Sequence, residues 1–408
     1  MSLIETVLNL VDKLPETTER SRAELALCTI ESTVAAVLHG HSSSQRERAI
    51  RRMCELAESI GEDSRLVRAL SSLSILHHTR GESAQGLELA RRCVAMASAV
   101  QDSCLLAEVS NVAGILAYQC GNLREAALHF EGALRDLPKM SRAVSPQTGI
   151  LYGSMIPCQV ALNLQLLGRV SEAAQAAEES LRYARRAGHL YSLAYALVTA
   201  GGFLALERRQ TDLARAYSEQ GIVLSEEHGY AEWLSWGRFI YGWALAELGR
   251  TTEGLTEMEA GIAGTERLGG VPGLQWLKAI RAEYLARNGR WAEALPLLTR
   301  SLAHIKGSGE RVYHAEILRL KGEVLLMCDP PAISEAEKSF REAIEVACTQ
   351  EGKWWELRAM VSLARLLRDT NRPDEARTML SEIYNWFTEG FDLPDLKDAK
   401  SLLDELGC

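Results

Sequence analysis

The chain has 408 residues, more than one compact core usually holds, so it forms either several domains or one extended array. Apolar residues make up 47% of the sequence, charged residues 24% and aromatic residues 6%, which is typical of a folded helical protein and excludes a disordered one. The formal net charge of −9 argues against nucleic acid as a partner, because nucleic-acid binders carry clustered positive charge.

Cysteine usage and the N-terminus indicate a cytoplasmic protein. The nine cysteines are scattered between Cys28 and Cys408 and form no Cys-x-x-Cys pair, so neither a disulfide framework nor a zinc site is expected. The first residues lack the basic region of a signal peptide, and no later stretch approaches the run of about 18 uncharged apolar residues that crosses a membrane. We therefore expect no membrane segment, no cofactor and no metal site.

A turn followed by a small residue recurs along the chain and sets its period. The pattern appears in Gly121-Asn-Leu-Arg-Glu-Ala126, in Gly168-Arg-Val-Ser-Glu-Ala173 and in Gly289-Arg-Trp-Ala-Glu-Ala294. The glycine favours the end of one helix, and the acidic residue favours the first turn of the next. The small residue falls at positions 49, 86, 126, 173, 214, 254, 294, 336 and 376, which gives a period of about 40 residues.

A second small position in most repeats predicts closely crossing helices. Twelve residues before the first small position come Gly114, Ala161, Gly202, Gly242, Ala282 and Ala364. These offsets match the places where the tetratricopeptide pattern needs Gly or Ala, because its paired helices approach too closely there for a longer side chain. A single pair cannot bury its apolar face alone, so stacked neighbours must share one core. We predict an all-α, tetratricopeptide-like solenoid of about nine repeats.

In chain order, residues 1–20 are expected to form the second helix of a truncated repeat and a linker. Residues 21–385 are expected to form the superhelical array, and residues 386–408 a C-terminal capping helix. Within the array, a loop is predicted at 138–146, and Pro157 should kink or restart its helix. The prolines at 330 and 331 predict another, longer loop. The incomplete first repeat is compatible with a fragment of a larger protein.

Three segments near the ends are more specific than the repeat. They are Leu14-Pro-Glu-Thr-Thr-Glu-Arg20, Lys353-Trp-Trp-Glu-Leu-Arg-Ala359 and Trp386-Phe-Thr-Glu-Gly-Phe-Asp392. They resemble the C-terminal tetratricopeptide region of bacterial multidomain P-loop ATPase and adenylate cyclase-type signalling proteins. The resemblance implies a signal-transduction protein whose catalytic domain lies upstream. The P-loop pattern itself is absent, since Gly352-Lys353 is followed by Trp354, so we expect this chain not to be an enzyme.

Aromatic and charged residues at groove-facing positions of the first helices are the candidate binding residues. In the family, the first helices line a concave groove, and positions 18, 15, 11 and 8 before the small residue face into it. This rule, with the aromatic clustering, selects Phe203, Trp236, Phe239, Trp243, Trp276, Glu283, Glu316, Arg319, Glu323, Arg358, Arg365 and Arg368. The aromatic members are interpreted either as core residues or as anchors of a hydrophobic groove. The charged members make the far end of the groove polar and then basic, which suits an acidic segment.

We therefore expect a non-catalytic scaffold that binds a protein or peptide segment in its groove and couples it to an upstream ATPase or cyclase region. The alternative is a small-molecule effector sensor in which the aromatic residues close a pocket. An enzyme hidden in the array is disfavoured, because no nucleophile, base and orienting group share a motif. The adjacent His77 and His78 point about 100° apart on a helix, so they are not expected to bind a metal together.

Overall fold

The chain folds into stacked pairs of helices, as predicted. The computed structural model describes residues 2–11, 13–269 and 272–407, and within these ranges the only extended pairing is an isolated bridge between Val144 and Leu151. Helix α1 (Ser2–Val11) precedes the pairs and α21 (Pro394–Leu406) follows them. The pairs are α2 (Thr18–His39) with α3 (Ser44–Ile60), α4 (Asp63–Thr79) with α5 (Ser83–Val100), α6 (Ser103–Gln119) with α7 (Leu123–Met140), α8 (Tyr152–Leu166) with α9 (Val170–Ala187), α10 (Leu190–Ala196), η1 (Leu197–Phe203) and α11 (Leu204–Glu207) with α12 (Thr211–His228), α13 (Ala231–Glu247) with α14 (Thr251–Arg267), α15 (Leu274–Arg287) with α16 (Trp291–Ser308), α17 (His314–Leu326) with α18 (Ile333–Thr349), and α19 (Lys353–Asp369) with α20 (Pro373–Trp386).

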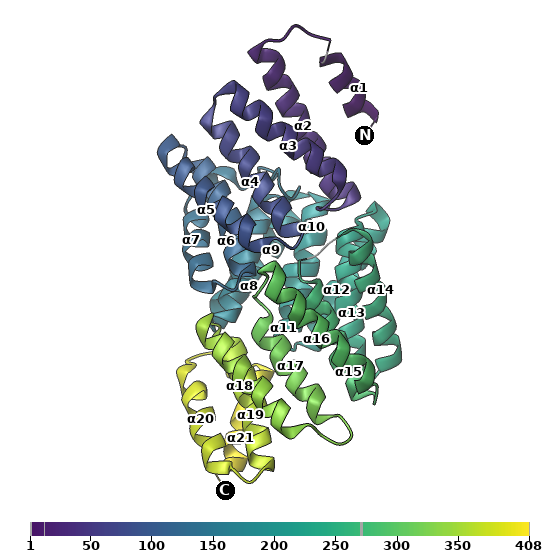
Figure 1. Ribbon diagram of the computed structural model, residues 1–408, viewed down its shortest axis with the longest axis vertical. Helices are drawn as coiled ribbons and strands as arrows, with labels where there is room; N and C mark the ends of the chain where they lie inside the picture. Colours follow the sequence, from purple (N-terminus) through teal and green to yellow (C-terminus); the bar gives the residue numbers. More distant parts are fainter. Residues whose placement is uncertain (1, 12, 270–271, 408) are drawn as a thin grey trace.

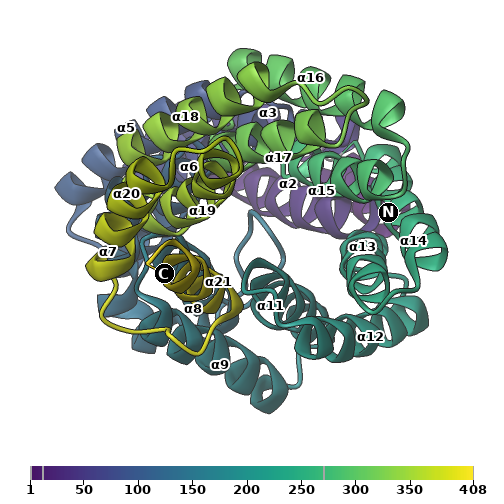
Figure 2. The ribbon, with the colours of Figure 1, turned by 90° about the horizontal axis from the view of Figure 1, so that it is seen from below.

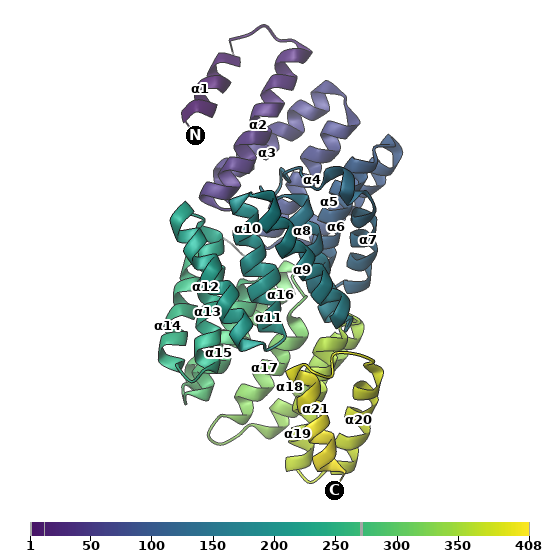
Figure 3. The same ribbon diagram turned by 180° about the vertical axis from the view of Figure 1, so that it is seen from behind.

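The pairs wind into a superhelix whose later turn stacks on its earlier one (Figures 1 and 3). Seen along the axis, the first helices of the pairs form an inner ring and the second helices an outer ring (Figure 2). Backbone bonds join the two turns directly, since Arg311 N and Val312 N donate to Gln119 O at 2.8 and 3.1 Å. At a second seam, Ser42 Oγ donates to Gly269 O at 2.6 Å. These contacts close the ring, and the space inside it, here called the channel, contains the two cavities described below instead of one open groove.

The turn glycines end the helices by the expected mechanism. Gly249 has a φ of 84°, a left-handed conformation that favours glycine. Its N–H donates to Ala246 O at 3.1 Å, and the N–H of Arg250 donates to Leu245 O at 2.9 Å. These bonds satisfy carbonyls that the helix end would otherwise leave free, and they let the next helix begin at once.

The small positions lie where the helices of a pair cross. The alanines at 126, 173, 214, 294, 336 and 376 are fully buried. At the α13–α14 crossing both partners are glycines: a Cβ on Gly242 would lie 2.6 Å from Gly254 O, and one on Gly254 would lie 2.5 Å from Gly242 O. The backbones touch there, which explains why the repeat tolerates no larger residue.

One loop and one proline differ in detail from expectation, whereas a second loop lies where it was predicted. The first loop follows α7, so Pro138 lies inside that helix and the loop spans 141–151. Helix α8 runs from Tyr152 through Pro157 to Leu166, so Pro157 does not restart it. The second loop lies between Leu326 and Ile333, as the doubled proline predicts.

The fifth pair contains a π-helical segment that sequence analysis missed. The helix from Leu190 to Glu207 is π-helical over Leu197–Phe203. By length and composition this helix could cross a membrane, so the expectation that no such stretch exists is wrong. In the structure 83% of that window is buried inside the superhelix, as in the core helix of a folded domain.

Candidate functional site: two cavities in the channel

The channel contains two adjoining cavities with different linings. The first, here the apolar cavity, has a volume of about 210 Å³ and is walled by residues of both superhelical turns. The second, here the charged cavity, has a volume of about 250 Å³ and lies beside α21. Both are formed mainly by first helices, the inner ring of Figure 2.

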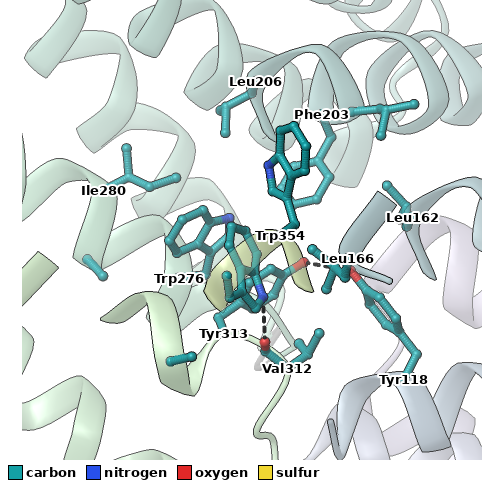
Figure 4. Packing of buried hydrophobic residues seen from close by; sticks show 14 of the residues in the cluster. Tyr118, Leu162, Leu166, Phe203, Leu206, Trp276, Ile280, Val312, Tyr313 and Trp354 are labelled. Carbon is teal, nitrogen blue, oxygen red and sulfur yellow. Dashed lines mark hydrogen bonds between the residues drawn. The ribbon is translucent and has the colours of Figure 1, made fainter. Parts of the chain in front are cut away.

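An aromatic partition separates the two cavities. Trp276 stacks on Tyr313 with ring centroids 5.0 Å apart and an interplanar angle of 5°. Phe203 meets Tyr313 edge-on, and the Tyr313 hydroxyl lies 3.4 Å from the Tyr118 hydroxyl of the earlier turn (Figure 4). Trp355 Nε1 donates to Val312 O at 3.1 Å and fixes the same segment. The partition is rigid because its rings come from four first helices and from the segment before α17.

The apolar cavity carries a few polar side chains among apolar and aromatic walls. His41 Nε2 lies 3.3 Å from Glu232 Oε2. Burial, with Arg46 and His78, lowers the pKa of His41 well below its usual value. Burial raises the pKa of Glu232 to about 7, although Arg46 opposes the shift. Within the described ranges, His41 Nδ1, Glu232 Oε2 and Gln119 Oε1 are buried without a hydrogen-bond partner.

Arg46 holds the loops around this cavity in place. It is completely buried, and it donates to His41 O at 2.7 Å and to Gln147 O at 2.6 Å. Burial lowers its pKa to about 10, so it stays cationic at neutral pH. Both terminal nitrogens of Arg46 donate to backbone carbonyls. They therefore form no hydrogen bond with Glu232, and Arg46 acts on that carboxyl group through its positive charge.

The charged cavity is lined by a connected ionic network. Arg319 binds Glu316 through two hydrogen bonds of 2.7 and 2.8 Å, and Ser362 Oγ donates to Glu323 Oε1 at 2.5 Å. Burial would lower the pKa of Arg319, but Glu316 and Glu323 outweigh it and raise that pKa. Arg358 joins the network through Glu316 at 3.2 Å and through Asp395 of α21 at 2.9 Å. The cavity thus offers both signs of charge.

Most of the predicted site residues lie on the two cavities. Phe203 and Trp236 line the apolar cavity. The charged cavity is lined by Trp243, Trp276, Glu283, Glu316, Arg319, Glu323, Arg358 and Arg365. Phe239 lines neither and is fully buried at the α13–α14 crossing, where Gly261 packs on it. Arg368 also lines neither and pairs with Asp369 and Glu405 at the surface. That these residues bind a ligand remains a prediction.

Sequence reasoning missed the residues that the earlier turn contributes. His41, His78, Gln119 and Tyr118 line the apolar cavity together with Tyr313 from the later turn. Their sequence positions give no sign of this meeting, because it depends on the pitch of the superhelix. The one available signal was the His77-His78 pair: His77 binds Glu82, while His78 faces the cavity.

The stability of the chain should fall in acid because His78 is buried as a neutral ring. Its Nδ1 lies 2.9 Å from Ser83 Oγ, and burial lowers its pKa to about 4. Below pH 6.5 the unfolded chain takes up a proton that the folded chain does not, so stability is lost as pH falls. From pH 7 to pH 5, wild type should lose about 2 kcal/mol more than His78→Gln, measured by urea unfolding.

The comparison with the variant isolates His78 from other buried groups. Burial raises the pKa of Glu232 and Glu310 to about 7, which acts in the opposite direction but is common to both proteins. Exposed His39→Gln is the control and should behave as wild type. An identical pH dependence in wild type and His78→Gln would contradict the neutral buried ring.

Helix pairs stacked around a closed channel define a tetratricopeptide-like solenoid. The tetratricopeptide repeat family profile matches residues 67–92, 275–300 and 357–382, each within one helix pair. No curated protein sequence matches the chain. Among solved structures, a Rap protein complexed with Competence and Sporulation Factor superposes with a TM-score of 0.65 at 12% identity, covering 86% of this chain and 92% of that one.

Two further solved structures are similar to a lower degree. Aspartyl phosphate phosphatase F from Bacillus subtilis has a TM-score of 0.48 at 12% identity, covering 94% of this chain and 96% of that one. A signal transduction ATPase with a tetratricopeptide repeat sensor from Pyrococcus horikoshii has a TM-score of 0.43 at 12% identity, covering 99% of this chain and 54% of that one. The repeats and the solenoid fold are therefore established by the structure, the repeat profile and the Rap superposition.

Proposed function

We propose that this chain is a non-catalytic interaction module that binds a protein segment inside its channel. The observation that carries the proposal is the position of α21, a segment of the same chain on the inner side of the ring (Figure 2). Asp395 pairs with Arg358 at 2.9 Å, Asp398 with Arg365 at 3.7 Å, and Glu405 with Arg368. The inner wall thus already holds one acidic helix by the arginines that the sequence assigns to binding.

The two cavities suggest how a second segment would be held. The aromatic walls of the apolar cavity suit a large apolar side chain, which interfaces commonly use as an anchor. The charged cavity suits polar residues farther along the segment, because Glu283 and Arg365 line it with opposite charges. The Rap protein of similar fold was solved with Competence and Sporulation Factor bound, which supports a ligand in such a superhelix.

We further propose that ligand binding is coupled to a catalytic region elsewhere in the parent protein. We base this proposal on the resemblance at Lys353-Trp-Trp-Glu-Leu-Arg-Ala359, which implies an ATPase or adenylate cyclase region upstream in a parent protein of the bacterial cytoplasm. An occupant would touch both turns, because residues of both line the apolar cavity. Binding would then change how the turns stack and so the position of the first repeats relative to any upstream domain.

A phage-displayed peptide library selected on the immobilised chain tests the proposal. Enriched peptides should bind the Trp236→Ala/Trp243→Ala variant at least about tenfold more weakly, since each loses an aromatic wall. Trp291→Ala, on the outer helix α16, is the matched control and should bind as wild type. Far-UV circular dichroism verifies that all variants are folded. Absence of enriched peptides, or equal loss in the control, would contradict channel binding.

A small-molecule effector is the second candidate, and the enclosure of the apolar cavity favours it. Its walls are largely apolar with a few polar atoms lacking partners in the described part of the chain, a common feature of ligand pockets. Thermal shifts with a metabolite collection, repeated on Trp236→Ala, would detect such a ligand. A shift that persists unchanged in the variant would locate the ligand elsewhere.

A further inference from the structure

We infer that the apolar cavity binds an amine, that is, a ligand with an apolar body and a hydrogen-bond-donating amino head. The cavity is closed on one side by the earlier turn, through Ile75, Ile115 and Gln119, and on the other by Trp236 and Tyr313 of the later turn. An occupant would thus contact both turns of the superhelix in a concave site, as small ligands usually do.

The body of the ligand is defined by the walls. Ile75, Ile115 and Leu162 present aliphatic surface, and Phe203, Trp236 and Tyr313 present rings. The π-helical segment contributes here, since Val198, Thr199 and Phe203 of η1 all reach the cavity. π-Helical turns occur frequently at functional sites, where they redirect side chains that a regular helix would place elsewhere.

The head of the ligand is defined by acceptors that have no donor. Gln119 Oε1 and Glu232 Oε2 are buried at the cavity wall. Neither accepts a well-aligned hydrogen bond from a described residue, although the ring nitrogen Nε2 of His41 lies 3.3 Å from the Glu232 oxygen. The Gln119 backbone is fixed, because its carbonyl receives the two bonds that join the turns. Leaving buried acceptors unpaired is costly, so a ligand that donates to these oxygens would gain affinity from the hydrogen bonds.

The charge around Glu232 favours a donor that is also a cation. His41, 3.3 Å away, is held neutral by burial. Arg46 supplies one positive charge, but both its terminal nitrogens bind backbone carbonyls. Tyr195, Trp233 and Trp236 also line the cavity, and aromatic rings attract an ammonium group that approaches their faces. A carboxylate head would be repelled by Glu232 and by the side-chain oxygen of Gln119. Trp233 Nε1, a buried donor on the same cavity, is the group that could bind it instead.

Three probes with one body and different heads test this inference. We would measure binding of 2-phenylethylamine, 2-phenylethanol and 3-phenylpropanoate to the full chain by calorimetry at neutral pH. The amine should bind at least about tenfold more tightly than the alcohol, and the carboxylate most weakly. In Glu232→Gln, which keeps the shape of the side chain, the preference for the amine should disappear.

Two further variants make the result specific to the cavity. Exposed Glu227→Gln, at the end of α12, removes the same charge elsewhere and should leave the preference intact. Ile115→Phe adds volume inside the cavity and should abolish amine binding while circular dichroism stays unchanged. Equal binding of the three probes, tightest binding of the carboxylate, or an amine preference that survives Glu232→Gln would overturn the inference.

The amino group could belong to a free amine or to the N-terminus of a bound peptide. The peptide alternative rests on the proposed function, the binding of a protein segment. The tripeptide Phe-Gly-Gly with a free or an acetylated N-terminus distinguishes them. Tighter binding of the free peptide than of 2-phenylethylamine, lost on acetylation, supports the peptide source. Binding of 2-phenylethylamine alone supports the free amine. If neither binds, the amine inference fails, whereas library peptides sensitive to Trp243→Ala would still support the proposed function.

Discussion

A Gly242→Leu variant should lose about 3 kcal/mol of its free energy of unfolding, the upper end of what overpacking costs. At this position a Cβ would lie 2.6 Å from the carbonyl oxygen of Gly254 and 2.7 Å from the amide nitrogen of Met258. Both are backbone atoms, so no side-chain rotation can make room. The α13 and α14 helices would have to separate, and the core that they share with the neighbouring pairs would open with them.

Gly307→Leu is the matched control for this effect. Gly307 also lies inside a helix, α16, but a Cβ there meets no described atom within 4 Å. The change should cost nothing and gain up to about 1 kcal/mol from helix propensity. Urea unfolding followed by circular dichroism gives both numbers. Equal costs at the two glycines would show that the close crossing is not at Gly242.

The repeat made the local fold predictable from sequence. A typical repeat contains a turn glycine, an acidic residue in the first helical turn and a buried small residue within a few tens of residues. Each such copy therefore shows the same local requirements for forming a helix pair. Ala294 and Ala282 illustrate this, since both are fully buried at the positions that the pattern assigns to a helix crossing. Nine similar copies make the pattern clear even where single copies such as that at Ala49 are weak.

The pitch of the superhelix was not predictable from the same pattern. The small rotation between neighbouring pairs accumulates over five or six repeats before Gln119 meets Arg311 and Val312. No short-range pattern encodes that meeting, so the closed channel and the apolar cavity could not be predicted. The π-helical segment at Leu197–Phe203 was not predicted either. It changes the hydrogen-bonding pattern of the helix within an apolar stretch whose sequence is typical of an ordinary α-helix.

The charged positions show a mixed outcome. Sequence analysis expected the arginines at the far end of the groove to receive an acidic segment, and it expected a closing helix at 386–408. It did not connect the two. In the structure Asp395, Asp398 and Glu405 of α21 pair with Arg358, Arg365 and Arg368. The acidic segment in contact with these arginines belongs to the chain itself.

An Arg358→Met variant should lose about 3 kcal/mol of its free energy of unfolding, the lower end of the cost of breaking a buried ion pair. Glu316 keeps Arg319 at 2.7 Å and Asp395 keeps Arg209 at 3.4 Å, but both lose a buried partner. The Arg358 side chain is 9% exposed and pairs with Glu316, 2% exposed, and Asp395, 6% exposed. It also donates to Glu207 O of the earlier turn, and its guanidinium lies 5.2 Å from the centre of the Trp355 ring. One side chain thus links α11, α17, α19 and α21.

Arg290→Met provides the comparison. Among the described residues Arg290 forms an ion pair only with Glu293, at the surface and at 2.7 Å, so this change should cost less than about 1 kcal/mol. Hydrogen exchange should show where the Arg358 effect acts, with the amides of α21 losing protection before those of α13. Adding Asp395→Asn to Arg358→Met should recover part of the loss, because it removes a buried negative charge that keeps only Arg209, at 3.4 Å, among its described partners. Uniform loss of protection along the chain would mean that Arg358 supports the whole solenoid. Selective release of α21 would free the arginine wall, and a synthetic peptide with the sequence of residues 394–406 should then compete with α21 for it.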